Sequence, residues 1–182
     1  MWFRIKSYLE FFWKSTNQHG VHSPFVYSLV TKCFYDYKYK EEYALINKQF
    51  TSKKAKLLFR LLKYFKPETL FTLQEHNNFF KEISAFACLP VSVGSTIGND
   101  YNMVYINTSK KATALHYFEQ LLSSVKNNSV WIFANIHSCR EMDEAWKAIK
   151  NHDTVTVTID TFYFGFVFFR REQGKENFTI RL

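Results

Sequence analysis

The hydrophobic pattern of this 182-residue chain changes its period partway along, and this change constrains the fold more than any other feature. Up to about residue 66, apolar residues recur at helical spacing, most clearly over 53–65. From residue 69 onward, short apolar runs typical of strands alternate with helical segments, and two strand patterns follow each other near the end. This order predicts a mostly parallel, Rossmann-like sheet with an antiparallel C-terminal hairpin, preceded by N-terminal helices.

The individual segments can be placed from their periodicity and their end signals. Ser23 followed by Pro24 is the signal of a helix N-cap, and Pro67 ends the helix before it. We divide the chain into an N-terminal helical extension, 1–66, and an α/β domain, 67–182, packed together as one unit. We expect helices at about 3–15, 24–34, 41–48, 53–65, 78–88, 110–125 and 141–150, and strands at 69–73, 91–93, 102–107, 129–134, 154–160 and 164–170.

Composition favours a folded domain without a membrane span. Hydrophobic residues make up 47% of the chain, including 20 Phe and 11 Tyr, which is ample material for a core. No apolar run reaches the roughly 20 residues that span a bilayer. The aromatic segment 1–13 contains Arg4, Lys6 and Glu10 and is followed by no cleavage-site pattern, so we interpret it as an amphipathic helix. We therefore expect a cytoplasmic protein.

Charge and cysteine content point to no dedicated partner or metal. The net charge is +8, but the cations are scattered and their densest groups are short (Lys38–Lys40, Lys53–Lys56 and Lys110–Lys111). Nucleic-acid binding is thus a weak alternative. The three cysteines, Cys33, Cys88 and Cys139, are too far apart for a zinc motif and odd in number. We expect buried, reduced thiols and no metal site.

The residues that follow the predicted strands deserve inspection, because ligands of parallel sheets bind at the strands' carboxyl ends. The first strand is followed by 73–78, a turn without glycine, where Glu75 and His76 are adjacent and expected to be solvated. Asn107 ends the strand 102–107. His137 follows 129–134; it is a weak candidate for a general base, and a buried histidine bonded to a backbone carbonyl is the favoured interpretation.

Together these segments resemble the class I S-adenosylmethionine-dependent methyltransferases. More narrowly, the chain resembles a bacterial group of predicted small-molecule methyltransferases, similar to the O-methyltransferases of catechol type. The stretches that carry the resemblance are 12–36 with its HGVHSPF motif, 54–70, 112–122 and 129–182. The resemblance implies a cofactor site at Gln74, Glu75, Asn107 and Asn135, and His137 matches a histidine of the family.

The departures from the family fall on these functional positions. Where the family has a glycine-containing acidic loop, an aspartate and a pair of acids, this chain has Gln74-Glu75, Asn107 and Ala134-Asn135. The interval between Leu73 and Asn102 holds one helix of ~11 residues and one strand of ~5, so the sheet is expected to be truncated around the family's strands 2 and 3. The residues 91–95 also lack the acid that would bind the cofactor ribose.

Three functions follow, and whether the chain is an enzyme stays open. The first is a methyltransferase-like pseudoenzyme that binds no cofactor and acts as a binding or interaction module. It would form a homodimer or bind a protein partner through the N-terminal helices or the exposed sheet edge. The second is an active methyltransferase using S-adenosylmethionine in an altered pocket lined by His137, Glu75 and Asn107. The third is a nucleic-acid-binding module that needs Lys38, Lys40, Lys53, Lys54 and Lys56 on one face.

Overall fold

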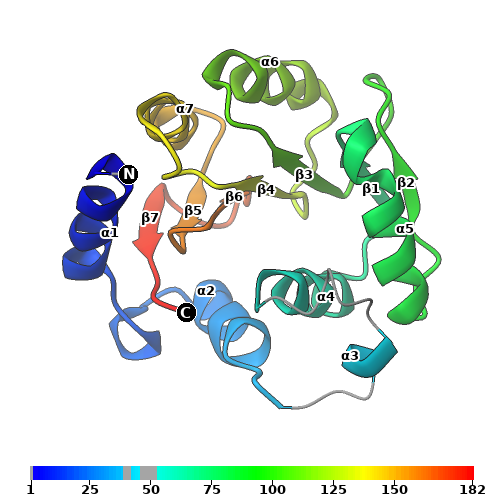
Figure 1. Cartoon of the computed structure of the whole chain (residues 1–182), viewed down its shortest axis with the longest axis horizontal. Helices are drawn as coiled ribbons and strands as arrows, with labels where there is room; N and C mark the ends of the chain where they lie inside the picture. Colours follow the sequence, from blue (N-terminus) through cyan, green and yellow to red (C-terminus); the bar gives the residue numbers. More distant parts are fainter. Residues whose placement is uncertain (1, 39–41, 46–52) are drawn as a thin grey trace.

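One mixed sheet organises the molecule, for which a computed structural model describes residues 2–38, 42–45 and 53–182. The sheet order is β2-β1-β3-β4-β6-β5-β7 (Figure 1). Every neighbouring pair is parallel except those made by β6, which runs antiparallel to β4 and β5. This confirms the predicted α/β fold with its antiparallel hairpin. The strands are β1 Thr69–Thr72, β2 Ser92–Gly94, β3 Met103–Asn107, β4 Val130–Ala134, β5 Val157–Asp160, β6 Phe164–Phe168 and β7 Glu176–Thr179.

The sequence predicts the strand at one edge of the sheet but not the strand at the other. At one edge, β2 does join the sheet and pairs with β1, but it is only three residues long. At the other edge, β7 was not predicted, because its sequence Glu-Asn-Phe-Thr is short and mostly polar. Pairing with β5 creates it, and Thr158 Oγ1 donates a hydrogen bond to Asn177 Oδ1 at 2.6 Å. Long-range pairing thus overrides weak local propensity.

Helices cover both faces of the sheet (Figure 1). On one face, α2 (Pro24–Leu29), α4 (Lys53–Phe65) and α5 (Asn77–Phe86) bury apolar residues such as Leu61 and Phe80 against the strands. On the other face, α6 (Lys111–Leu121) and α7 (Arg140–Asn151) bury Phe118 and Trp146. The apolar stripes that predicted these helices are therefore the surfaces that contact the sheet. The short 3-10 turns are η1 (Gln18–Gly20), η4 (Gln74–His76) and η5 (Leu122–Ser124).

The helix starting at Pro24 shows how local signals and tertiary contacts combine. Ser23 caps it as predicted, since its Oγ accepts a hydrogen bond from the Val26 N–H. The helix continues as a π-helical turn, η2 (Val30–Phe34). The buried guanidinium of Arg60 on α4 donates hydrogen bonds to the carbonyls of Cys33 and Phe34, which fixes the end of this turn. The next predicted helix, 41–48, is described only as α3 (Glu42–Leu45); the rest lies outside the described residues.

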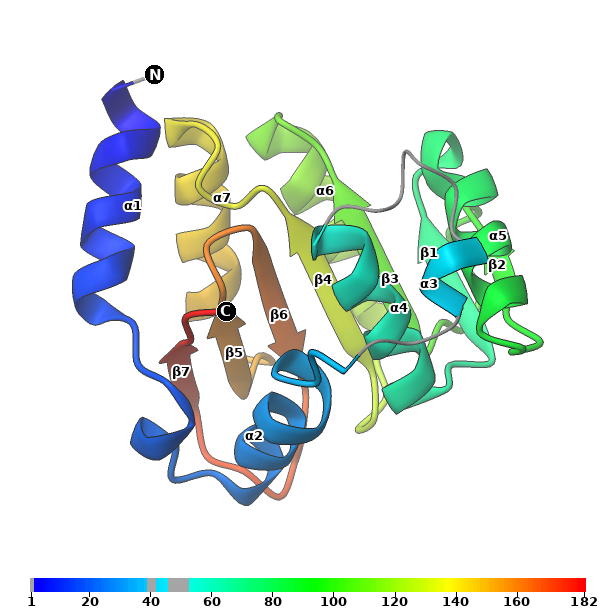
Figure 2. The ribbon, with the colours of Figure 1, turned by 60° about the horizontal axis from the view of Figure 1, so that its bottom comes forward.

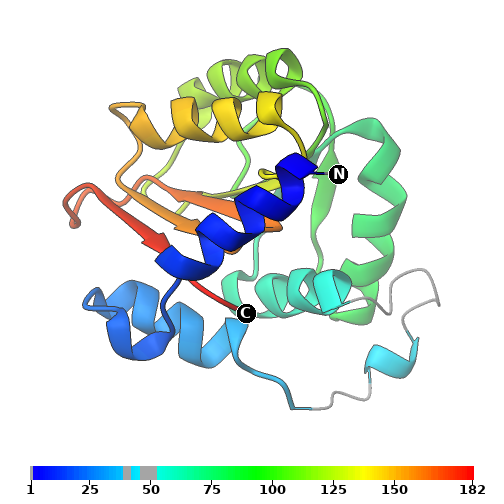
Figure 3. The same ribbon diagram turned by 60° about the vertical axis from the view of Figure 1, so that its left-hand side comes forward.

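The first helix, α1 (Trp2–Lys14), lies on the outside of the molecule at the side of the sheet formed by β5 and β7 (Figures 2 and 3). It contacts the β5–β6 connection, where Phe162 packs against Tyr8 and Phe11. Thr16, just after α1, forms a parallel bridge with Ile180. The division of the chain at residues 66 and 67 stays a prediction. Among the described helices, none combines the length and apolar character needed to cross a membrane.

Candidate functional site: the carboxyl edge of the sheet

The strand order places a topological switch point between β1 and β3. The chain leaves β1 toward β2 on one side, and it leaves β3 toward β4 on the other. Open α/β sheets bind their ligands in the crevice outside the carboxyl ends of the strands at such a point. Gln74, Glu75, Asn107 and Asn135 all follow or end these central strands, so the structure brings the predicted positions to one edge.

His76 bridges the switch point. It follows β1 in the turn η4, and its Nε2 lies 3.3 Å from Nδ2 of Asn107, the last residue of β3. Glu75 Oε1 lies 3.2 Å from the same nitrogen of His76. The imidazole also packs edge-on against Tyr105 of β3. The expectation that His76 is solvated is therefore wrong, because its ring spans the crevice and is mostly covered.

The hydrogen bonds continue from Asn107 across the next strand. Asn135, directly after β4, donates from Nδ2 to Asn107 Oδ1 at 2.9 Å. Lys54 of α4 donates from Nζ to Asn135 Oδ1 at 3.1 Å. We call these residues the crevice network: Glu75, His76, Asn107, Asn135 and Lys54. It links the ends of three adjacent strands to α4 through side chains of this chain alone.

Lys54 is held at this site by more than one contact. Its ammonium lies 4.4 Å from the centre of the Tyr163 ring, which is a cation–π contact. Burial, assisted by the charge of Arg4, lowers the pKa of Lys54. Sequence reasoning counted Lys54 only among surface cations. No sequence signal connects it to Asn135, which is 81 residues away, so it was missed as a site residue.

The turn after β1 does not offer the open backbone that a nucleotide-type cofactor needs. Leu73, His76 and Asn77 all have negative φ, and the 3-10 turn passes straight into α5 without a glycine. The side chains of Gln74 and Glu75 are exposed. A Cβ on Gly94 of β2 would lie 2.9 Å from the Tyr101 hydroxyl. The lack of a side chain at Gly94 therefore makes room for Tyr101. These features do not fit an adenosyl group.

A cavity of about 470 Å³ adjoins the crevice network on the α4 and α5 side of the sheet. Its volume falls within the roughly 300–1,000 Å³ of ligand pockets in general. It contains both polar and aromatic groups, and it excludes His137. The lining residues are Lys54, Ala55, Leu58, Glu75, His76, Asn78, Phe79, Glu82, Tyr105, Asn107, Ala134, Asn135 and Phe164.

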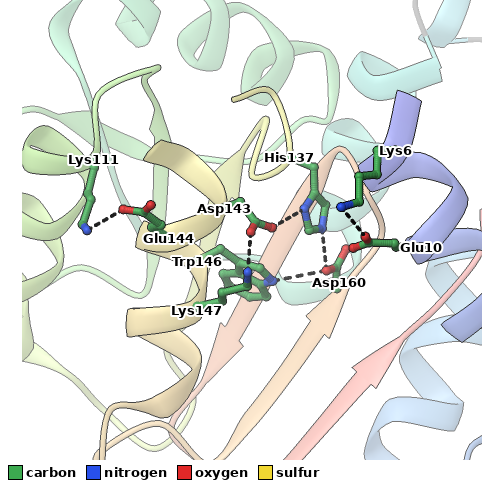
Figure 4. Close-up of polar contacts among 9 residues, drawn as sticks. All are labelled: Lys6, Glu10, Lys111, His137, Asp143, Glu144, Trp146, Lys147 and Asp160. Atoms are coloured by element: carbon green, nitrogen blue, oxygen red, sulfur yellow. Dashed lines mark hydrogen bonds and ion pairs between the residues drawn. The ribbon is translucent and has the colours of Figure 1, made fainter. Parts of the chain in front are cut away.

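His137 belongs to a different arrangement, which we call the histidine clamp: His137, Asp143, Asp160, Trp146 and Lys147 (Figure 4). The imidazole lies between two carboxylates. Nδ1 is 2.9 Å from Asp143 Oδ1, and Nε2 is 2.7 Å from Asp160 Oδ2. Trp146 donates from Nε1 to Asp160, and Lys147 pairs with Asp143. The interpretation of His137 as bonded to a backbone carbonyl is therefore wrong.

This environment favours the imidazolium form. Burial by itself lowers the pKa of His137, but hydrogen bonds to Asp160 and Asp143 and their negative charges outweigh it, so the pKa is raised. A doubly bonded imidazolium has no free lone pair to accept a proton. Asp160 is committed as well, since its Oδ1 accepts from the Phe162 N–H and caps the hairpin turn. The clamp is built to hold the hairpin, and it does not present a base to the crevice.

The clamp contains residues that the sequence did not single out. Asp143 and Trp146 are three residues apart on α7 and share one helical face, which is the pattern that would have indicated them. In the described parts of the chain, no three His, Cys, Asp or Glu side chains gather to hold a metal ion. Cys33 is buried, Cys139 is partly buried and Cys88 is exposed, so the expectation of burial is wrong for Cys88.

Comparisons with known proteins show the fold. No protein-family model and no curated protein matches the chain. Among solved structures, an SAH-bound methyltransferase from Podospora anserina matches with a TM-score of 0.50 and 6% identity, over 82% of this chain and 97% of that one. An O-methyltransferase from Bacillus cereus in complex with SAH matches with a TM-score of 0.46 and 11% identity, over 78% and 94%. The Podospora likeness and the strand order identify the class I methyltransferase fold.

Proposed function

We propose that this chain uses the class I methyltransferase fold without its cofactor, as a non-catalytic module that binds a partner. The observation that carries the proposal is the contact between His76 and Asn107, which spans the crevice at the switch point. In this fold an adenosyl cofactor would lie between the turn after β1 and the end of β3. Here a side chain from the first contacts a side chain from the second.

The chemistry of the crevice network supports the same proposal. A cofactor ribose is held best by a carboxylate, but Asn107 and Asn135 offer amides that already bond to each other. Displacing His76 would remove the partner of the Asn107 amide nitrogen, and losing one such hydrogen bond costs about 1 kcal/mol. The cofactor would have to supply that energy without the glycine turn or the acids that provide it elsewhere.

Calorimetric titration of the full chain with S-adenosylmethionine and S-adenosylhomocysteine tests this proposal. We expect no saturable heat with either compound. The Podospora methyltransferase, which was crystallised with SAH, is the matched positive control. Circular dichroism on the same sample establishes that the chain is folded. Saturable binding of either compound in the micromolar range would refute the loss of the cofactor site.

A second candidate function has a specific observation in its favour. The cavity beside the crevice network is large enough for a small molecule, and Glu75 and Asn107 line it. An active methyltransferase with an altered pocket would use this cavity. The sequence predicts His137 in that pocket, but it is held in the histidine clamp. Transfer of a labelled methyl group from S-adenosylmethionine to small phenols or catechols would establish this activity, and its absence across such a panel favours the first proposal.

The nucleic-acid proposal finds less support in the placement of the lysines. Lys54 points toward Asn135 and Tyr163, whereas Lys56 lies over the ring of Tyr43. These two cations therefore leave α4 in different directions. Lys40 lies outside the described residues. A measured affinity for DNA or RNA that falls steeply with added salt would support nucleic-acid binding.

A partner needs a surface, and two are available. The edge strand β2 has an open side, but it is only three residues long. Helix α1 offers a longer surface on the far side of the sheet (Figure 2). A homodimer or protein complex through either surface remains part of this proposal, and size-exclusion chromatography with light scattering over a range of concentrations measures it.

A further inference from the structure

Helix α1 leaves an apolar stripe exposed, and Ile5 and Leu9 of this stripe also line a hollow beside Phe162 and Tyr163. Trp2, Ile5, Leu9 and Phe12 recur at spacings of three and four residues, and Trp13 lies beside them. Trp2 is 80% exposed and Trp13 is 86% exposed, while Ile5, Leu9 and Phe12 are each about half exposed. When one face of a helix packs against a domain, the apolar residues of the helix are expected on that buried face.

The exposure of the stripe does not arise from a loosely attached helix. The opposite side of α1 is seated on the domain, where Phe11 is buried and contacts Phe162. The Tyr8 ring packs edge-on against the Phe162 ring, with 5.0 Å between the ring centres. Phe162 in turn stacks on His137 of the histidine clamp. The stripe therefore lies on a helix that is firmly packed against the domain.

The exposed area is large for a protein surface. An aromatic side chain has about 150–250 Å² to bury, so the two tryptophans alone expose roughly 300–400 Å². The largest apolar patch on a typical monomer is about 300–600 Å². Adding the three half-exposed residues brings this stripe to the upper end of that range or beyond it. A surface of this size marks an interaction site.

The charges around the stripe select the kind of partner. Lys6 and Lys14 lie on α1, and the guanidinium of Arg181 lies 4.7 Å from the centre of the Phe12 ring, whereas Arg4 lies over the Tyr163 ring of the domain. The one acid of the helix, Glu10, pairs with Lys6 (Figure 4). The surroundings of the stripe are thus positively charged, in a chain whose net charge is +8. Two copies brought together through this face would repel each other, whereas an anionic surface would be attracted.

We infer that α1 docks on an anionic lipid surface, with its apolar stripe in the headgroup region and its cations toward the lipid phosphates. Tryptophan at both ends of the stripe, leucine and phenylalanine between them, and flanking Lys and Arg are the composition of helices that lie in a membrane interface. The inference deepens the proposed function by naming a partner. It is tested separately, because cofactor titration reports on the crevice and lipid binding reports on α1.

Sedimentation of the full chain with vesicles tests the inference. One set contains phosphatidylcholine and phosphatidylglycerol in equal parts, and the other contains phosphatidylcholine alone. We expect binding to the anionic vesicles that weakens as salt is added, and much weaker binding to the neutral ones. The variant Ile5→Ser/Leu9→Ser should lose about tenfold or more in affinity, because it removes two apolar side chains from the contact. The matched control is Ile97→Ser, an exposed apolar residue elsewhere.

Three results would overturn the inference. The first is no binding to anionic vesicles. The second is equal binding by wild type, the α1 variant and the Ile97→Ser control. The third is a concentration-dependent dimer that the α1 variant abolishes while lipid binding is unchanged, which would assign the stripe to a second copy of the chain. Since the substituted side chains are exposed, far-ultraviolet circular dichroism should show all variants folded.

Discussion

Two histidines lie at the carboxyl edge of the same sheet, and their surroundings are opposite in character. His76 follows β1 and shares its Nε2 between the Asn107 amide and an exposed glutamate. His137 follows β4 and is enclosed by two carboxylates and the Phe162 ring, and one of these carboxylates, Asp160, also accepts from the Trp146 N–H. The first arrangement is a contact between amides and an imidazole across a crevice, and the second is a buried ion cluster.

The difference indicates what each half of the edge does. The histidine clamp ties α7 to the β5–β6 hairpin, and through Phe162 it supports α1. The crevice network ties three strand ends to α4 and lines the cavity at this edge of the sheet. One half therefore holds the scaffold together, and the other places side-chain contacts across the crevice at the switch point. Variants in the two halves should behave differently.

The largest expected effect is on stability at the clamp. The variant His137→Ala leaves Asp143 and Asp160 without the cation between them, and breaking a buried ion pair in this way costs about 3–5 kcal/mol. The variant His76→Ala removes a partly exposed hydrogen bond and should cost about 1 kcal/mol or less. Urea unfolding followed by tryptophan fluorescence measures both. Equal losses would show that the two histidines are equivalent and would break the comparison.

A smaller loss of stability is expected for a substitution at the contact between the histidine clamp and the sheet. A Cβ at Gly165 of β6 would lie 2.6 Å from the Trp146 ring, which donates to Asp160. Overpacking at such a buried site costs about 1–3 kcal/mol, so Gly165→Ala should lower the midpoint of urea unfolding. Gly174→Ala is the matched control, because a Cβ there meets nothing within 4 Å. An unchanged midpoint for Gly165→Ala would mean that Trp146 is not seated against β6.

The smallest effect to measure is the pH dependence that the clamp imposes. Because the folded-state pKa of His137 is raised, its contribution to stability is complete below its unfolded pKa of about 6.5 and is lost as pH rises through the folded pKa. The pKa of Asp143 is lowered despite partial burial, chiefly by Lys147 and then His137, so its contribution is lost as pH falls through its folded pKa.

Unfolding free energies across this pH range check the assignment. Wild type should lose stability on the alkaline side, and His137→Gln should not show that loss, since glutamine does not titrate. If the variant keeps the same alkaline slope, the slope comes from another group and the clamp is not ionised as described.

Most of the fold was predictable from local patterns, and most of the site was not. The helices, the hairpin and the short β2 follow from periodicity and from caps such as Ser23, which act between near neighbours in sequence. The position Asn107 was found because strand ends must share one edge, and Asn135 was found through the family resemblance. The contacts of Lys54 and His76 depend on how α4 and η4 pack, and β7 depends on pairing with β5, so no local pattern encodes them.

The central claim is that His76 and Asn107 close the place of the cofactor. Two-dimensional ¹H–¹⁵N spectra of the full chain during titration with S-adenosylhomocysteine test it most directly. We predict that the backbone signals of residues 74–78 and the side-chain amides of Asn107 and Asn135 stay in place. Progressive, saturating shifts confined to these signals would show the cofactor resting in the crevice and would contradict the account.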